Sequence, residues 1–261
     1  MSTIRTLAGA SFLLLGVALA PLSARGATLA EVQGDAGLRL CANPEGLPFS
    51  SQDPARPGIQ LELARRIAGA LGVKSSVSWI FDRRAAGGAG CEVFMSAIVT
   101  PRPRAPMRLT RPYSGSGYVL VVPRNDNAVK TFADLGARKV GVVVQSVAQW
   151  VLTKRGLTTT PAFTEDELVE MVLTGQAAAA AVSMPYAGWY LKEHPNAALK
   201  IADGYVPEPE LRWNVAVGVR NADKALLDAV SRVLDALRRD GAIQAAFAKY
   251  GVPYYPPYPS E

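Results

Sequence analysis

Residues 117–123 read GYVLVVP, a long apolar run that predicts a buried strand. A second run of this kind, VAVGVR at 215–220, follows much later in the chain. Before the first run and between the two, strand and helix patterns alternate, which is typical of α/β units. We therefore predict two lobes joined by a double hinge. Lobe 1 is expected at 38–118 and 214–261, and lobe 2, with hinge segments included, at 119–213.

Within each lobe the pattern is that of a mainly parallel sheet flanked by helices. Apolar residues at helical spacing predict helices at 59–71 and 223–239, and Gly72 is suited to end the first of them. Ser146 and Thr164 are suitable N-caps for two further helices. The remaining strands are expected at 38–42, 73–81, 92–99, 139–144, near 160 and at 177–182, and the remaining helices at 165–174, 186–192 and 242–250.

The first 26 residues have the composition of a secretory signal peptide. Arg5 gives a positive start, residues 7–20 form an apolar run, and small or turn-forming residues follow. The run is short for a membrane span, which needs about 20 apolar residues. The first cysteine is Cys41, so none lies at the cleavage region, and we expect no lipid or other membrane anchor. The pattern predicts a periplasmic protein, cleaved near residues 24–27.

Composition and charge narrow the classes of function. Of the 261 residues 49% are apolar, enough for a sizeable core, and the net charge is +6. A nucleic-acid-binding protein would gather Lys and Arg on one face, whereas here they are scattered. His194, the single histidine, lies in a polar turn with no Cys or His spaced to share a metal. We expect no nucleic-acid partner, no metal and no cofactor.

The sequence has two cysteines, Cys41 in the strand-like run LRLCA and Cys91 at the start of CEVFMSAIV. If these strands are neighbours in one parallel sheet, their Cα atoms come close enough for a disulfide. An oxidising compartment favours the bridge. Two buried free thiols are the alternative.

Several segments carry a resemblance to a known family. The run LRLCANPEGLPFS resembles the opening of the extracellular solute-binding proteins of family 3, and later segments agree in order across nearly the whole chain after the signal. This resemblance implies the type 2 fold of periplasmic binding proteins, two lobes with a ligand cleft between them. The later segments are TRPYSGSGYVLVV, ADLGARKVGVVVQS, VEMVLTGQAAAAAVSMPYAGWY and VAVGVR.

Some details resemble a narrower branch, the J component associated with periplasmic quinoprotein (methanol) dehydrogenases. They are the positions of the two cysteines and the segments PYAGWY and KYGVP. The branch implies an accessory protein whose partner is a quinoprotein alcohol dehydrogenase or its cytochrome. The broad family implies instead a receptor that delivers a small polar solute to an ABC permease.

The resemblance also implies which residues face the cleft. Phe49 and Tyr113 could stack on an apolar or planar ligand, but could also pack the strand ends. Ser146 fits either ligand contact or a helix cap. Trp213 fits core or hinge packing better than a site. The residues expected to bind ligand are Asn43, Phe49, Tyr113, Ser114, Arg102, Ser146 and Ser183, with Ser116 beside them.

The sequence departs from the pattern of amino-acid receptors at the positions that would grip an amino acid. Those receptors hold the ligand carboxylate with an Arg where this chain has Pro103, between Arg102 and Arg104. They pair the ligand ammonium with an Asp where this chain has Ser183, and a hydroxyl cannot neutralise a desolvated ammonium. A family glycine is replaced by Gln145. These departures argue against a standard α-amino acid as ligand.

A non-catalytic function is expected. One histidine in a turn allows no Ser-His-Asp set, and bridged cysteines allow no Cys-His pair. Glu45 is the only carboxylate that the sequence places near the cleft entry. The primary hypothesis is the accessory role, and the alternative is an ABC-transporter receptor for a small polar solute other than a standard α-amino acid.

Overall fold

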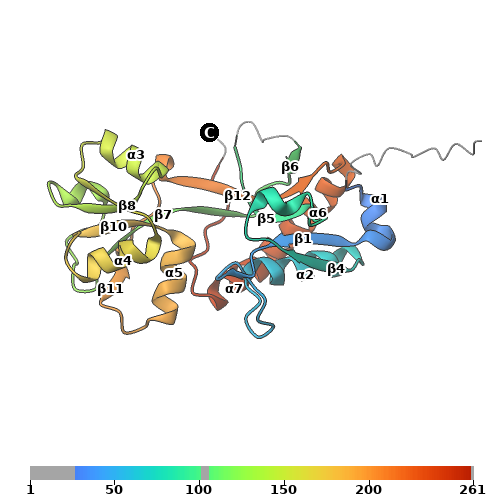
Figure 1. Cartoon of the computed structure of the whole chain (residues 1–261), viewed down its shortest axis with the longest axis horizontal. Helices are drawn as coiled ribbons and strands as arrows, with labels where there is room; N and C mark the ends of the chain where they lie inside the picture. Colours follow the sequence, from blue (N-terminus) through green and yellow to red (C-terminus); the bar gives the residue numbers. More distant parts are fainter. Residues whose placement is uncertain (1–26, 101–105, 260–261) are drawn as a thin grey trace, which may run out of the picture.

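The structure is a computed structural model that describes residues 27–100 and 106–259. The predicted signal peptide at 1–26 and Arg102 lie outside the described residues. The chain forms two halves side by side, linked by two long strands, β7 and β12 (Figure 1). Each half has its own apolar core. The predicted two-lobed α/β architecture is confirmed.

The first half contains a parallel sheet in which β1 (Leu38–Ala42) lies between β4 (Ser75–Trp79) and β5 (Val93–Ile98). Helix α2 (Ile59–Leu71) has the predicted limits, and its buried stripe faces this sheet. It ends at Gly72, whose φ of 69° lies in the left-handed region that glycine adopts readily.

Two helices from the end of the chain complete this first core. They are α6 (Lys224–Arg239), capped by the Asp223 side chain, and α7 (Ala242–Lys249). The core therefore combines residues from both ends of the described chain, from Ala27 to Val252.

The second half is formed by one continuous stretch of chain. Strand β8 (Val140–Val143) lies between β9 (Thr159–Ala162) and β10 (Ala179–Ser183), all parallel. Ser146 and Thr164 cap their helices as predicted, each accepting a hydrogen bond from a backbone N–H three residues on. The helices of this half are α3 (Val147–Lys154), α4 (Glu165–Leu173) and α5 (Met184–Glu193), and β11 (Leu199–Ile201) lies at the sheet edge.

Strands β7 (Ser114–Pro123) and β12 (Arg212–Arg220) pair with each other in antiparallel fashion where the halves meet. Beyond this pairing, β12 is antiparallel to β5 and β7 is antiparallel to β10. Each half therefore has a mixed sheet in which the linking strand runs against its neighbours. The pairing of the two linking strands joins the sheets of the two halves into one continuous strand order (Figure 1).

The tail after α7 crosses the junction of the halves (Figure 1). Tyr255 forms an isolated antiparallel bridge with Gly115 of β7. The Asn214 side chain of β12 forms two hydrogen bonds with the backbone of Tyr258, one accepted (2.8 Å) and one donated (2.9 Å). The tail is therefore held against both linking strands.

Cys41 and Cys91 form a disulfide with a Cα–Cα distance of 5.3 Å. The glycine-rich link before Cys91 contains one short helical turn, η2 (Arg83–Ala86), and no longer helix. The other short elements are α1 (Leu29–Glu31), η1 (Val32–Ala36), β2 (Glu45–Gly46), β3 (Ser50–Ser51), β6 (Met107–Leu109), η3 (Phe132–Leu135) and η4 (Pro209–Leu211).

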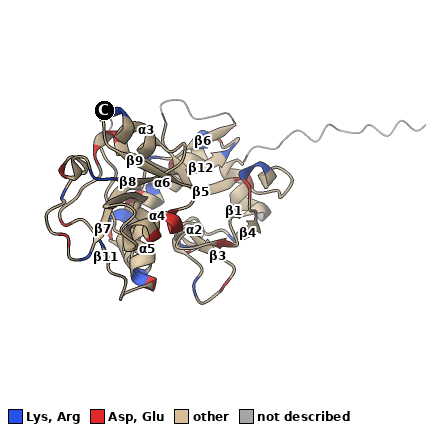
Figure 2. Ribbon diagram, turned by 60° about the vertical axis from the view of Figure 1, so that its left-hand side comes forward, with Lys and Arg blue, Asp and Glu red and all other residues tan. Residues whose placement is uncertain are grey.

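Lys and Arg are spread over both halves rather than gathered on one face (Figure 2). Within the described residues, no helix is long and apolar enough to cross a membrane. The same residues contain no group of three or more His, Cys, Asp or Glu side chains placed to hold a metal ion.

Candidate functional site

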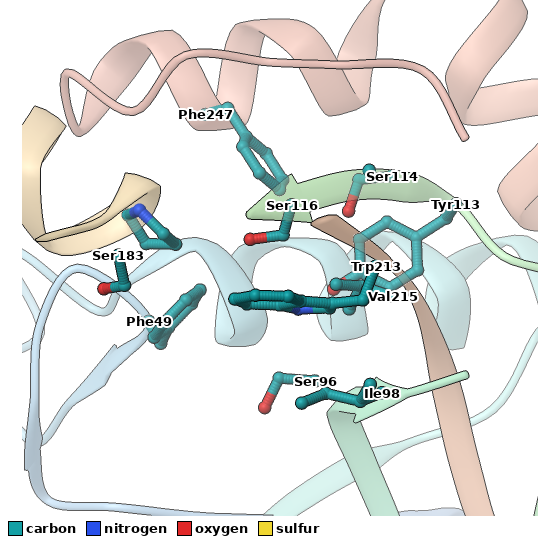
Figure 3. A pocket seen from close by; sticks show the side chains of 12 residues that line it. Phe49, Ser96, Ile98, Tyr113, Ser114, Ser116, Ser183, Trp213, Val215 and Phe247 are labelled. Carbon is teal, nitrogen blue, oxygen red and sulfur yellow. The ribbon is translucent and has the colours of Figure 1, made fainter. Parts of the chain in front are cut away.

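A cavity of about 210 Å³ lies where the two halves meet. Ligand sites for drug-sized molecules measure roughly 300–1,000 Å³, so this cavity suits a smaller solute. Residues of both halves and of both linking strands form its wall (Figure 3). The lining residues are Phe49, Ser96, Ile98, Tyr113, Ser114, Gly115, Ser116, Ser183, Pro185, Trp213, Val215 and Phe247.

Four aromatic side chains contribute to the wall. Trp213 of β12 extends its indole ring into the middle of the group, towards Phe49 (Figure 3). The ring is held edge-on against Tyr118, with centroids 5.4 Å apart and planes at 75°. The structure thus places Trp213 in the cavity as well as at the hinge, whereas the sequence favoured core or hinge packing over a site.

The position of Phe49 is fixed by the start of α2. Its carbonyl oxygen accepts a hydrogen bond of 2.8 Å from the N–H of Gln60, and its N–H donates to Gly46. Gly58 lies so close that a Cβ there would be 2.4 Å from the Phe49 oxygen, and its φ is 92°. Only glycine fits this position, so Gly58 allows the loop to present Phe49 to the cavity.

Tyr113 offers its ring but not its hydroxyl. The hydroxyl donates a 2.6 Å hydrogen bond to the Met95 carbonyl oxygen, and burial raises the pKa of Tyr113 well above its usual value. Ser114 and Ser116, on β7, supply polar atoms at the cavity wall (Figure 3). Their hydroxyls are neutral and can donate or accept.

Ser183, at the end of β10, is bound to a carboxylate that the sequence did not place here. Its backbone N–H donates to Glu165 Oε1 at 2.6 Å, and its hydroxyl donates to Oε2 at 2.9 Å. Burial raises the pKa of Glu165, and the two hydrogen bonds from Ser183 offset only part of this rise. Glu45, the carboxylate expected near the cleft, is instead exposed in the small β2–β3 hairpin.

Ser146 lies in a separate groove with Gln149, Trp150 and Gln145. Its hydroxyl accepts a hydrogen bond from the Gln149 N–H. Gln145 has a φ of 59°, in the left-handed region. Its N–H donates to the Gln149 side chain at 2.7 Å, which supports a conformation that glycine would adopt more easily.

The structure thus brings five of the predicted residues together at one cavity, namely Phe49, Tyr113, Ser114, Ser116 and Ser183. Asn43 lines an adjacent pocket on the other side of Phe49, and its side chain accepts a hydrogen bond from the Glu45 N–H. No lysine or arginine is among the lining residues of the main cavity that the structure describes.

Large apolar side chains are exposed on strand-end loops and on α3. Phe163 is 80% exposed after β9 and Phe81 is 76% exposed after β4. Ile98 at the end of β5 and Trp150 on α3 are also exposed. We call Phe81, Ile98, Trp150 and Phe163 the apolar rim.

Comparison with known proteins agrees with the fold. The chain is 28% identical over 213 residues to a probable amino-acid ABC transporter-binding protein of Haemophilus influenzae, covering 76% of this chain and 77% of the relative. The structure is similar to the unliganded, open L-cystine solute receptor of Neisseria gonorrhoeae (TM-score 0.73, 21% identity, 85% and 96% of the chains covered).

A similar match is an ancestral cationic amino acid solute-binding protein (TM-score 0.70, 23% identity, 85% and 99% of the chains covered). At these identities the solved structures establish the fold alone. The model of the bacterial extracellular solute-binding proteins, family 3, matches residues 38–253. The match spans most of the chain, and the protein belongs to this family.

Proposed function

We propose that this protein is the solute receptor of an ABC-type uptake system and that the interlobe cavity receives the solute. The observation that carries the proposal is the cavity itself, whose wall comes from both halves and both linking strands. A solute there would touch both halves at once, as a receptor that closes around its ligand requires. The Haemophilus influenzae relative, named as a transporter-binding protein, supports the same class.

The proposal assigns roles to the residues at the cavity. Phe49 and Trp213 would hold the apolar part of the solute, and Ser114 and Ser183 its polar part. The predicted residues Asn43 and Ser146 would contribute from the margins of the cleft, and Arg102 stays a ligand residue proposed from the sequence. In this proposal lobe 1 comprises residues 38–118 and 214–261, and lobe 2 comprises residues 119–213. The protein works in the periplasm after removal of residues 1–26, delivers its solute to an ABC permease and has no catalytic role.

Thermal unfolding of the protein against a broad solute panel tests this function. A ligand at one hundred times its dissociation constant stabilises the folded state by about 2.7 kcal/mol, which raises the Tm by roughly 5–10 °C for a chain of this size. Trp213→Ala should abolish the shift. Trp150→Ala, which removes a tryptophan outside the cavity, is the matched control and should preserve it. No shift with any solute would contradict the receptor function.

The apolar rim favours a second candidate. Exposed Phe81 and Phe163 could contact a protein, as the accessory role beside a quinoprotein alcohol dehydrogenase would require. The Cys41–Cys91 disulfide agrees with the sequence features that suggested this branch. Co-purification from periplasm should then recover the dehydrogenase or its cytochrome, and Phe81→Ser with Phe163→Ser should abolish recovery. Recovery of neither protein would count against the accessory role.

A further inference from the structure

Glu165 places a carboxylate behind the cavity wall, and no cationic side chain of the described residues is paired with it. Both of its carboxylate oxygens accept hydrogen bonds from Ser183, and Ser183 lines the cavity. Within residues 27–100 and 106–259, no lysine or arginine forms an ion pair with Glu165. A half-buried carboxylate of this kind gains free energy when a cation approaches it.

The hydrogen-bond arrangement at Ser183 also selects the group that can meet it. The hydroxyl hydrogen of Ser183 is used by Glu165 Oε2. Ser183 lines the cavity, and its hydroxyl oxygen has only acceptor capacity left for a further partner. A ligand group at this position must be a donor, and the strongest donor beside a carboxylate is a cationic N–H.

The remaining wall agrees with a cationic ligand. Phe49, Trp213 and Phe247 present aromatic rings, whose faces attract cations. The described lining of the cavity includes no lysine or arginine, and Arg83 lines the adjoining pocket, where it donates to the Ser96 carbonyl oxygen. Ser114 and Ser116 are neutral and tolerate either a donor or an acceptor.

We propose that the cavity binds an organic cation, namely an amine with a small apolar body and no carboxylate. The ammonium group meets the Ser183 oxygen and the Glu165 charge, and the apolar body lies against Trp213 and Phe49. The inference rests on the proposed role of the cavity as a solute site and adds the chemical class of the solute. Glu165 is the residue that determines this specificity.

Calorimetric titration at pH 7.5 with matched probes tests the proposal. The probes are 2-phenylethylamine, 2-phenylethanol and 3-phenylpropanoate, with 3-methylbutylamine and 3-methylbutanol as an aliphatic pair. A charge-assisted hydrogen bond is worth about 1.5–3 kcal/mol. Each amine should therefore bind roughly tenfold or more tightly than its alcohol, and the carboxylate should bind more weakly than both.

Glu165→Gln keeps the shape of the side chain and removes the charge. Its amide oxygen can still accept from the Ser183 N–H, while its amide nitrogen donates to the Ser183 oxygen, so that this second bond is reversed. The variant should reduce the preference for amine over alcohol to less than about threefold. Glu170→Gln, an exposed carboxylate on the same helix, is the matched control and should preserve the preference. The wild-type comparison of amine with alcohol tests the proposal even if the Glu165 variant does not fold.

The outcomes distinguish failure of the amine proposal from failure of the proposed receptor function. Equal or tighter binding of the alcohols or the carboxylate, or an unchanged preference in Glu165→Gln, overturns the amine proposal and leaves the cavity as a receptor for another class. Absence of binding by every probe and by the broad solute panel overturns both.

Discussion

Gly188 of α5 packs against Gly251 so closely that a Cβ atom on Gly188 would lie 2.5 Å from the Gly251 carbonyl oxygen. Helix α5 belongs to the second half, whereas Gly251 follows α7 of the first. The neighbouring Trp189 packs against Tyr250 with ring centroids 5.9 Å apart. The two halves therefore touch through backbone at this point as well as through the linking strands.

Gly188→Ala should consequently destabilise the protein by about 1–3 kcal/mol, because the added methyl group has no space and the backbone must move. Urea unfolding measures this loss. Gly69→Ala is the control, since Gly69 lies in α2 with no atom within 4 Å of its Cβ position. That change should be neutral or stabilise by up to about 1 kcal/mol. Equal stability of Gly188→Ala and the wild type would contradict the close packing.

Removal of the Cys41–Cys91 disulfide should lower the free energy of unfolding by about 4 kcal/mol, because the bridge closes a long loop in the unfolded chain. The separation of the two cysteines is 50 residues. Urea unfolding of a Cys41→Ala, Cys91→Ala double variant checks the size of the effect. A reductant should destabilise the wild type and leave the double variant unaffected. A reductant effect on both proteins would point to a cause other than this bridge.

Glu165 should make stability depend on pH. Burial raises its pKa in the folded state above the unfolded value of about 4.3. Its stabilising contribution is therefore complete below the unfolded pKa and is lost as the pH rises through the folded pKa. Glu165→Gln should be more stable than the wild type at pH 7, and this difference should shrink towards pH 4. Urea unfolding of the wild type, Glu165→Gln and the control Glu170→Gln at pH 7 and pH 4 measures these stabilities. The same stability difference between Glu165→Gln and the wild type at both pH values would contradict a cost of burying the Glu165 charge.

Asn214→Ala should release the tail from the linking strands. It removes both hydrogen bonds to the Tyr258 backbone, a loss of about 1–3 kcal/mol. Limited proteolysis followed by mass spectrometry should show faster cleavage within residues 252–259. The exposed Asn196→Ala serves as control and should leave the cleavage rate unchanged. Unchanged cleavage in Asn214→Ala would show that the aromatic contacts alone hold the tail.

The sequence predicted the elements whose signals are local. Helix α2 follows its apolar spacing up to Gly72, and α6 follows its stripe from the cap at Asp223. The caps at Ser146 and Thr164 are confirmed for the same reason, since each depends on residues within one turn.

Contacts between distant segments could not be predicted in this way. Glu165 and Ser183 belong to different elements, and only the packing of α4 beside β10 brings them together. Trp213 and Tyr255 have no local pattern that distinguishes a cavity or a hinge from ordinary core packing. The short helical turns of α1 and η1 before β1 were also missed, because they have too few residues for a periodic signal.

The division of the two cores along the chain has a consequence for the order of folding. The second core draws its buried residues from Val119 to Leu211, so it can form as soon as this stretch is available. The first core needs α6 and α7, whose residues come at the end of the chain. Long sequence separation slows the formation of such contacts. When the chain emerges N-terminus first, the sheet of the first half therefore lacks α6 and α7 while the second half folds. During that interval α2 and this sheet expose apolar surface and are the part of the chain most prone to aggregation.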